Sequence, residues 1–192
     1  MNNQSRLAIA VVAVALAITG CGGDQVNMPR PKGWPRIALP GHGYHHWENG
    51  PCPFSFDLPV QAKADSMLLD SCWINFYYPD FDYRWHITYR SIPGSGKTRQ
   101  QHFQEYHTLV YKHIQKSTRI NETPLHNANG DGIFYELYGS IGVPAQFIFG
   151  DDKHLVMASF YFPTAVNGDS LAPVIGFVKE DMQKMIESIK WK

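Results

Sequence analysis

The sequence predicts an α+β protein, in which an antiparallel β-sheet is flanked by two amphipathic helices and preceded by an extended tether. Segments of alternating apolar and polar residues, separated by short turns, predict antiparallel strands with one wet face. Two stretches with helical spacing of apolar residues predict helices that cover this sheet. A region rich in Pro and Gly lies before all of these elements, and such a composition favours extended chain.

The composition excludes several classes of protein. Of 192 residues, 44% are hydrophobic and 18% are charged, which is too apolar for a disordered chain and too polar for a protein with many membrane spans. Seventeen Lys and Arg balance seventeen Asp and Glu, so the formal net charge is +0 and nucleic-acid binding is disfavoured. Aromatic residues make up 14% of the chain, which suits packed or half-exposed sheet faces.

Residues 1–20 have the pattern of a lipoprotein signal peptide. Arg6 precedes twelve uninterrupted apolar residues, Leu7–Ile18, whereas a membrane-spanning helix needs about 20. The run ends in Ile18-Thr19-Gly20-Cys21, so we expect Cys21 to be lipidated and to become the first residue after cleavage. Two alternatives are an ordinary secretory cleavage site within residues 13–17 and a helix that stays in the membrane.

The lipid on Cys21 predicts attachment to a membrane on the periplasmic side of the cell envelope. Several acyl chains on one Cys anchor a protein firmly, since a single chain binds only marginally. Gly22 follows Cys21, where Asp would favour retention in the inner membrane. The sequence therefore favours the outer membrane over the inner membrane.

Residues 21–50 are predicted to form a tether, and residues 51–192 a single α+β domain. Four Pro and six Gly within the tether disfavour a helix. Large apolar side chains also occur there, which a plain linker would lack. We take four of them as candidate partner-binding residues, because aromatic and large aliphatic anchors dominate interfaces: Trp34, Ile37, Tyr44 and Trp47. The tether is expected to lie in a groove of its own domain or on a partner.

Within the domain, strands alternate with turns and the two helices follow from apolar spacing. Strands are predicted at 54–58, near 61–64, and at 73–78, 83–90, 133–139, 143–149 and 154–162, with a loop at 121–131. Thr98 is predicted to cap a helix that runs to about Lys116. Asp169 or Ser170 is predicted to cap the last helix. The apolar stripe of that helix comprises Leu171, Val174, Ile175, Val178, Met182, Met185, Ile186 and Ile189.

Two motifs resemble functional sites but are better explained otherwise. Ser91–Thr98 ends in Gly-Ser-Gly-Lys-Thr like a phosphate-binding loop, yet Ser91 stands where that signature needs Gly, so we predict a helix start and no nucleotide. His42, His45 and His46, with Glu48 nearby, could hold zinc or copper. Because this segment is rich in Gly and lacks standard ligand spacing, we favour a solvated polar loop and predict no metal and no cofactor.

The sequence lacks the common catalytic motifs. Neither Gly-x-Ser-x-Gly nor His-Glu-x-x-His occurs, so we predict that the protein is not an enzyme. Two cysteines, Cys52 and Cys72, remain once Cys21 is lipidated. An oxidising compartment favours a disulfide between them, and the alternative is a pair of reduced, buried thiols.

An ordered set of short motifs extends over nearly all of the mature chain. The motifs are Pro31–Trp34, Arg36-Ile37, Leu39-Pro40, Cys52–Phe56, Cys72–Ile74, Ala145–Phe147, Ala158–Phe162, Asp169–Ile175 and Trp191-Lys192. In this set the chain resembles the GldD family of gliding-motility lipoproteins. Pro35 and Ala38 depart from the family pattern, which affects only the expected tether contacts. The order of strands and helices is also similar to that of the PsbP-like α/β/α sandwich.

The resemblance implies a component of the gliding machinery, linked to type IX secretion, that acts as a non-catalytic scaffold. Its partners would be other gliding and secretion proteins, together with the membrane through the lipid anchor. The alternative is a lipid-anchored binding or processing factor for a small ligand, metal or cell-wall fragment. A large, convergent apolar pocket would favour that alternative, whereas a flat aromatic patch would favour the scaffold.

We predict that Cys21→Ala abolishes lipidation, because only the thiol of Cys21 can accept the lipid at this site. Membrane fractionation and mass spectrometry should find either the uncleaved precursor or protein released from membranes. Normal cleavage together with normal membrane retention of this variant would contradict the assignment.

Overall fold

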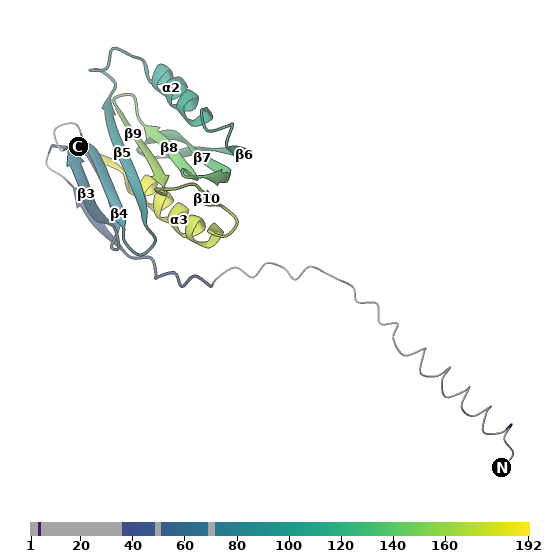
Figure 1. Ribbon diagram of the computed structural model, residues 1–192. Helices are drawn as coiled ribbons and strands as arrows, with labels where there is room; N and C mark the ends of the chain where they lie inside the picture. The colour runs from purple at the N-terminus through teal and green to yellow at the C-terminus, as the bar shows by residue number, and fades with distance from the viewer. Residues whose placement is uncertain (1–3, 5–35, 49–50, 69–71) are drawn as a thin grey trace. The chain divides into compact units, whose positions relative to one another are not determined.

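The chain divides into two units, Met1–Trp34 and Pro35–Lys192. A computed structural model describes residue 4 and residues 36–48, 51–68 and 72–192 (Figure 1). Cys21 and Trp34, and the predicted signal peptide apart from residue 4, therefore lie outside the described residues. Among the described residues, no helix is long and apolar enough to cross a membrane.

The second unit contains a long antiparallel sheet. Its strands, in spatial order, are β10 (Val166–Asn167), β7 (Gly130–Ile141), β8 (Ala145–Gly150), β9 (His154–Tyr161), β5 (Tyr83–Ser91), β4 (Trp73–Tyr78) and β3 (Lys63–Leu68). Strand β6 (Ser117–Asn127) also pairs with β7. The sheet has the meander connections that its short turns predict, since β7, β8 and β9 are consecutive in the chain and adjacent in space.

A smaller sheet brings the two ends of this unit together. Strand β2 (Phe54–Pro59) lies in its centre, between β1 (Tyr44–Glu48) and β11 (Lys190–Trp191). In this sheet Trp47 lies opposite Phe56, and Lys190 lies opposite Ser55. The chain before the first cysteine and the last residues of the chain are thus held by the same central strand.

The two helices cover opposite faces of the long sheet (Figure 1). Helix α2 (Arg99–Tyr111) packs Tyr106 and Val110 against β7, β8 and β9. Helix α3 (Ala172–Ser188) lies on the other face and shares one core with the long sheet and the smaller sheet. This layered arrangement confirms the predicted α+β class.

The predicted stripe of α3 forms much of this core. Val178, Met182, Met185 and Ile189 are 0% exposed, and Leu171 and Ile175 are partly buried against them. Two buried residues of the helix were not predicted, namely Phe177 and Asp181. The predicted cap is wrong, because Leu171 occupies the N-cap position without a side-chain hydrogen bond. Pro173 lies in the first turn of α3, where its missing amide hydrogen costs no hydrogen bond within the helix.

The loop predicted at 121–131 is wrong, because most of it belongs to the eleven-residue strand β6. This strand pairs with β7 alone, and most of its side chains are exposed or half-buried. An edge strand of this kind lacks a buried apolar face, and it tolerates Pro124, which cannot donate a backbone hydrogen bond. Apolar alternation, the signal that marks the other strands, is therefore weak here.

Three boundaries also differ from the predictions. Helix α2 ends at Tyr111 instead of near Lys116, because Lys112 closes it by donating its backbone N–H to Leu109 and Val110. The described residues 36–48, assigned above to the tether, are part of the compact second unit. The reason is that residues 44–48 pair with β2 as strand β1. The strand expected near 61–64 is β3, at Lys63–Leu68.

We predict that Met185→Asp destabilises the fold strongly. Met185 is 0% exposed, and an unpaired carboxylate at such a position costs about 3 kcal/mol or more. Thermal and urea unfolding measure the loss. Gln183→Asp, an exposed position of the same helix, is the matched control and should change stability by only about 0.5 kcal/mol. Equal melting temperatures for the two variants would show that the stripe is not part of the core.

Candidate functional site

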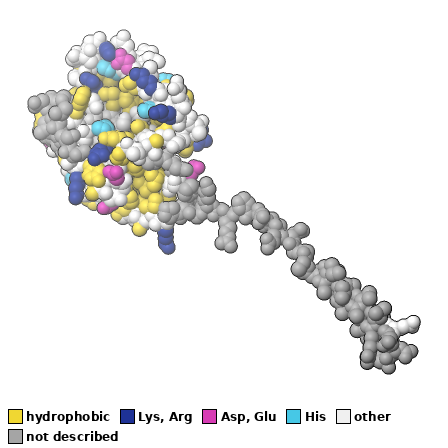
Figure 2. All heavy atoms as spheres, in the orientation of Figure 1, with side chains coloured by type: hydrophobic (Ala, Val, Ile, Leu, Met, Phe, Trp, Pro, Cys, Tyr) yellow, Lys and Arg dark blue, Asp and Glu magenta, His cyan; other side chains and the backbone are white. Residues whose placement is uncertain are grey.

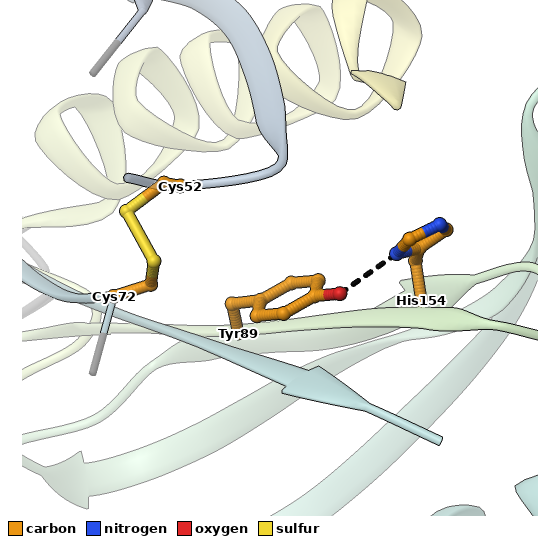
Figure 3. Close-up of a disulfide and its surroundings, with 4 residues drawn as sticks. All are labelled: Cys52, Cys72, Tyr89 and His154. Atoms are coloured by element: carbon orange, nitrogen blue, oxygen red, sulfur yellow. Dashed lines mark hydrogen bonds between the residues drawn. A yellow bond between two sulfur atoms is a disulfide. The ribbon is translucent and has the colours of Figure 1, made fainter. Parts of the chain in front are cut away.

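The two cysteines of the domain join its two sheets. Cys52 lies just before β2 and Cys72 just before β4, and Figure 3 shows the disulfide between them. Their Cα atoms are 5.6 Å apart, and both residues are buried. A cross-link over 20 residues of sequence restricts the unfolded chain and is worth about 3 kcal/mol in the loop-entropy model. The disulfide thus stabilises the contact between the smaller sheet and the long one.

A polar pair lies near the disulfide. The Tyr89 hydroxyl and Nδ1 of His154 are 2.7 Å apart (Figure 3). His154 also stacks on Trp191, with ring centroids 5.2 Å apart. The indole N–H of Trp191 donates to the carbonyl of Asn129 at 2.7 Å. These contacts hold the last strand, β11, against the long sheet.

Three of the four predicted partner-binding residues are used within the domain itself. Trp47 packs on Phe56 and Phe76 with ring centroids 4.9 and 5.8 Å apart, and Ile37 is partly buried against the same core. Tyr44 donates a hydrogen bond to the buried Asp181. The fourth, Trp34, lies outside the described residues. The described segment 36–48 therefore packs on its own domain, one of the two arrangements expected above.

His42 fixes this segment to α3. Its Nδ1 lies 2.8 Å from Oδ1 of Asp181, and its Nε2 lies 2.9 Å from Oε2 of Glu180. Its ring stacks on Phe177, with centroids 4.2 Å apart. The Tyr44 hydroxyl donates to the same Asp181 oxygen at 2.9 Å. We call this set of residues the His42 clamp: His42, Tyr44, Phe177, Glu180 and Asp181. The prediction of a solvated loop is wrong at His42, because this side chain is bound to helix α3.

Burial decides the electrostatics of the clamp. The Asp181 side chain is 1% exposed, and burial raises the pKa of Asp181, whereas its hydrogen bonds to His42 and Tyr44 oppose this rise. A raised pKa means that the folded state holds the proton of Asp181 more tightly than the unfolded chain does. The contribution of Asp181 to the free energy of unfolding therefore falls as the pH rises above the usual pKa of an aspartate. Burial, together with the hydrogen bond to Asp181, also raises the pKa of Tyr44.

The geometry of the clamp favours a structural role over catalysis. Both ring nitrogens of His42 face carboxylates, so neither is directed at an open site where it could act on a substrate. The neighbouring His46 lies 3.7 Å from Glu48 and 3.6 Å from Asp57, and the ammonium group of Lys192 lowers the pKa of Glu48. Among the described residues, no group of three or more His, Cys, Asp or Glu is placed to hold a metal ion.

The Gly-Lys-Thr turn starts α2. The Thr98 side chain accepts a hydrogen bond from the Gln101 backbone, and the Gln101 side chain accepts one from the Thr98 backbone. This reciprocal pair satisfies backbone donors that a helix start would otherwise leave open. The Lys97 ammonium lies 2.6 Å from Glu105. The turn therefore caps the helix, as the sequence predicted.

Among the described residues, no helix packs on the α2 side of the long sheet over β4 and β5. Helix α2 packs on β7, β8 and β9, and the same face continues over β4 and β5. We call this region the open face: Trp73, Tyr77, Arg84, His86 and Tyr161. Trp73 is 47% exposed. His86 stacks on Tyr161 with centroids 4.3 Å apart, and the guanidinium of Arg84 lies 4.8 Å from the Tyr77 ring centroid.

The open face carries one stacked pair, His86 and Tyr161, and one cation–ring contact, between Arg84 and Tyr77. Exposed hydrophobic side chains among Lys, Arg and His are also seen on the side of the molecule drawn in Figure 2, in which no residue is labelled. The alternation of β4 and β5 predicted which residues face the core. It did not reveal that α2 stops short of their outer face, because the sequence does not state how far this helix extends over the sheet.

Comparison with solved structures defines the class of fold. The chain is similar to cyanobacterial PsbP from Synechocystis sp. PCC 6803, with a TM-score of 0.50 and 11% sequence identity, over 82% of this chain and 99% of that one. The fold is therefore PsbP-like. Residues 24–191 match the family described as gliding motility lipoprotein GldD, and the chain belongs to this family. It is accordingly a lipoprotein of the cell envelope. A search of curated proteins finds no match.

We predict that His42→Ala lowers the free energy of unfolding by about 1–3 kcal/mol at neutral pH, because the buried Asp181 carboxylate loses a hydrogen-bond partner. Urea unfolding monitored by tryptophan fluorescence measures this loss. His45→Ala, an exposed neighbour on β1, is the control and should be nearly neutral. Similar stability of both variants would show that the clamp does not hold segment 36–48 on α3.

Proposed function

We propose that this protein is a non-catalytic scaffold of the gliding machinery, anchored by lipid on Cys21 to the periplasmic side of the outer membrane. Membership of the GldD family supports the assignment to gliding motility. The proposed link to type IX secretion follows from the resemblance to that family. The proposed lipid on Cys21 rests on the signal pattern at Ile18-Thr19-Gly20-Cys21.

The open face is the single observation that best supports action through protein contacts. Its rings and the Arg84 guanidinium belong to the residue types that are enriched at protein interfaces. Trp73 presents a large apolar surface at low entropic cost, because its strand already fixes the backbone. A partner that covers this face would bury Trp73 together with the stacked pair of His86 and Tyr161.

The contact surface that we propose lies on the sheet, whereas the sequence alone favoured the tether. Trp47 and Ile37 pack on the core, so their replacement would damage the domain itself, and a loss of motility would not report on a partner. Trp73 is the better test residue, because nearly half of its surface is exposed, at 47%. Trp34 remains a candidate partner-binding residue of the tether.

We predict that Trp73→Ala abolishes gliding when it replaces the native chain in the bacterium, because truncation of a central interface Trp costs about 2 kcal/mol or more of binding. Colony spreading and single-cell tracking measure gliding. Protein abundance and membrane fractionation should be unchanged, and unfolding should change by less than about 1 kcal/mol.

Leu109→Ala is the matched control. Leu109 is 52% exposed on α2, so the change removes a similarly exposed apolar side chain from outside the open face. It should leave gliding intact. Normal gliding of the Trp73→Ala variant would show that the open face is not part of the interface. Equal loss in both variants would show that the effect is not specific to that face.

A further inference from the structure

A groove lies on the α3 side of the long sheet, where the sheet extends beyond the helix. Its volume is about 740 Å³, within the range of sites that enclose small ligands or short peptides. We call it the α3 groove. Its floor is formed by Glu136, Tyr138 and Ser140 of β7 with Arg119 of β6, and its wall by Ala172 and Gly176 of α3. None of these residues belongs to the open face or to the His42 clamp.

The groove and the open face are on opposite faces of the sheet. Glu136 lies opposite Ala145, and Ala145 lies opposite Phe160, which is part of the core shared with α3. Trp73 lies opposite Thr88, and Thr88 lies opposite Met157, which packs with the α2 core. Residues directly opposite each other in a sheet share a face. A ligand in the groove would therefore leave the open face free.

An irregularity in the backbone presents Arg119 to the groove. The pairing of β6 with β7 shifts register between Ser117 and Arg119, so that Arg119 lies opposite Tyr138. Gly139 adopts a φ of 125°, where an added Cβ would lie 3.1 Å from backbone atoms of Lys116 and Thr118. Only glycine fits this position without strain. Bulges of this kind re-aim side chains and are frequent beside functional sites.

Two basic and two acidic residues line the groove, namely Arg119 and Lys179 with Glu136 and Asp169. Lys179 forms an ion pair with Glu136, and the Tyr138 hydroxyl donates to the same carboxylate at 3.5 Å. The Arg119 guanidinium lies over the Tyr138 ring, 4.1 Å from its centroid. Within the described part of the chain, no carboxylate pairs with Arg119. Stacking on a ring leaves the edge of a guanidinium available for a bidentate bond to a carboxylate.

The helical wall of the groove is open at Gly176. A Cβ built at this residue would meet nothing within 4 Å, so the packing of the domain does not require a glycine there. Glycine inside a helix costs about 1 kcal/mol relative to alanine. Its lack of a side chain, next to Ala172 one turn earlier, leaves a smooth apolar wall that a main chain can approach closely.

We propose that the α3 groove binds an extended peptide segment that carries a carboxylate group. The carboxylate bonds to Arg119, and an apolar side chain beside it lies between the Tyr138 ring and the wall at Ala172 and Gly176. An acidic sugar fits less well, because the wall at Ala172 and Gly176 offers no polar side chain to it. The polar side chains of Thr118, Ser140 and Asp169 line other parts of the groove, and the Glu136 carboxylate is already held by Lys179.

The test is an NMR titration of the full-length lipoprotein in detergent micelles, with three probes. They are the peptide acetyl-Val-Leu-Glu-Leu-Val-amide, its counterpart with Gln in place of Glu, and glucuronic acid. The Glu peptide should shift the amide signals of Tyr138, Gly139 and Lys179. The Gln peptide should bind about tenfold more weakly, which is the cost of losing a charged hydrogen bond.

Two variants separate the parts of the site. Arg119→Gln should remove the difference between the Glu and Gln peptides, whereas Arg90→Gln, an exposed Arg on β5 away from the groove, should preserve it. Gly176→Leu should weaken both peptides about tenfold or more by filling the groove. Its thermal stability should be unchanged or higher, because leucine favours a helix more than glycine does.

Several outcomes would overturn the proposal. They are equal binding of the Glu and Gln peptides, full binding by the Gly176→Leu variant, or no shift of the groove amides with the Glu peptide. Stronger binding of glucuronic acid at the same amides would instead identify a sugar site. These results are independent of the motility of the Trp73→Ala variant, so this proposal and the scaffold proposal can fail separately.

Discussion

Helix α3 is the element on which the rest of the domain depends, because its apolar surface is buried between two sheets at once. Val178, Met182 and Met185 are fully buried in a core to which both sheets contribute. The smaller sheet has three strands, of which β11 has two residues, so packing against a helix adds to its stability. It persists because α3 and the disulfide hold it against the long sheet.

The same helix also fixes the chain before β1. Asp181 is buried on α3 and accepts hydrogen bonds that the side chains of segment 36–48 supply. A buried carboxylate without these donors would be costly, so the helix and the segment depend on each other. This mutual dependence explains why aromatic residues in a region rich in Pro and Gly pack on the domain.

The lengths of the two helices leave two distinct parts of the long sheet without helical cover among the described residues. Helix α2 does not extend over β4 and β5, which leaves the open face with Trp73. Helix α3 does not extend to the start of β6, which leaves the groove with Arg119 and Tyr138. The two surfaces lie on opposite faces of the sheet and do not overlap.

The sequence by itself determined the fold class, the predicted lipoprotein signal and the core stripe of α3, because these depend on local periodicity and on short motifs. It also predicted the disulfide, since only two cysteines remain after Cys21. Strand β6 escaped prediction, because an exposed edge strand carries no apolar alternation. The roles of His42 and Asp181 escaped it as well. The two residues are 139 positions apart, and no local pattern links them.

Only the tertiary structure decided which aromatic residues pack on the core and which stay exposed. Trp47 and Trp73 are both tryptophans in strands, and the local sequence does not distinguish their roles. One packs on the core and the other stays 47% exposed. The physical reason is that burial depends on which distant element covers a side chain, and that is fixed by the packing of helices on sheets rather than by the residue or its neighbours.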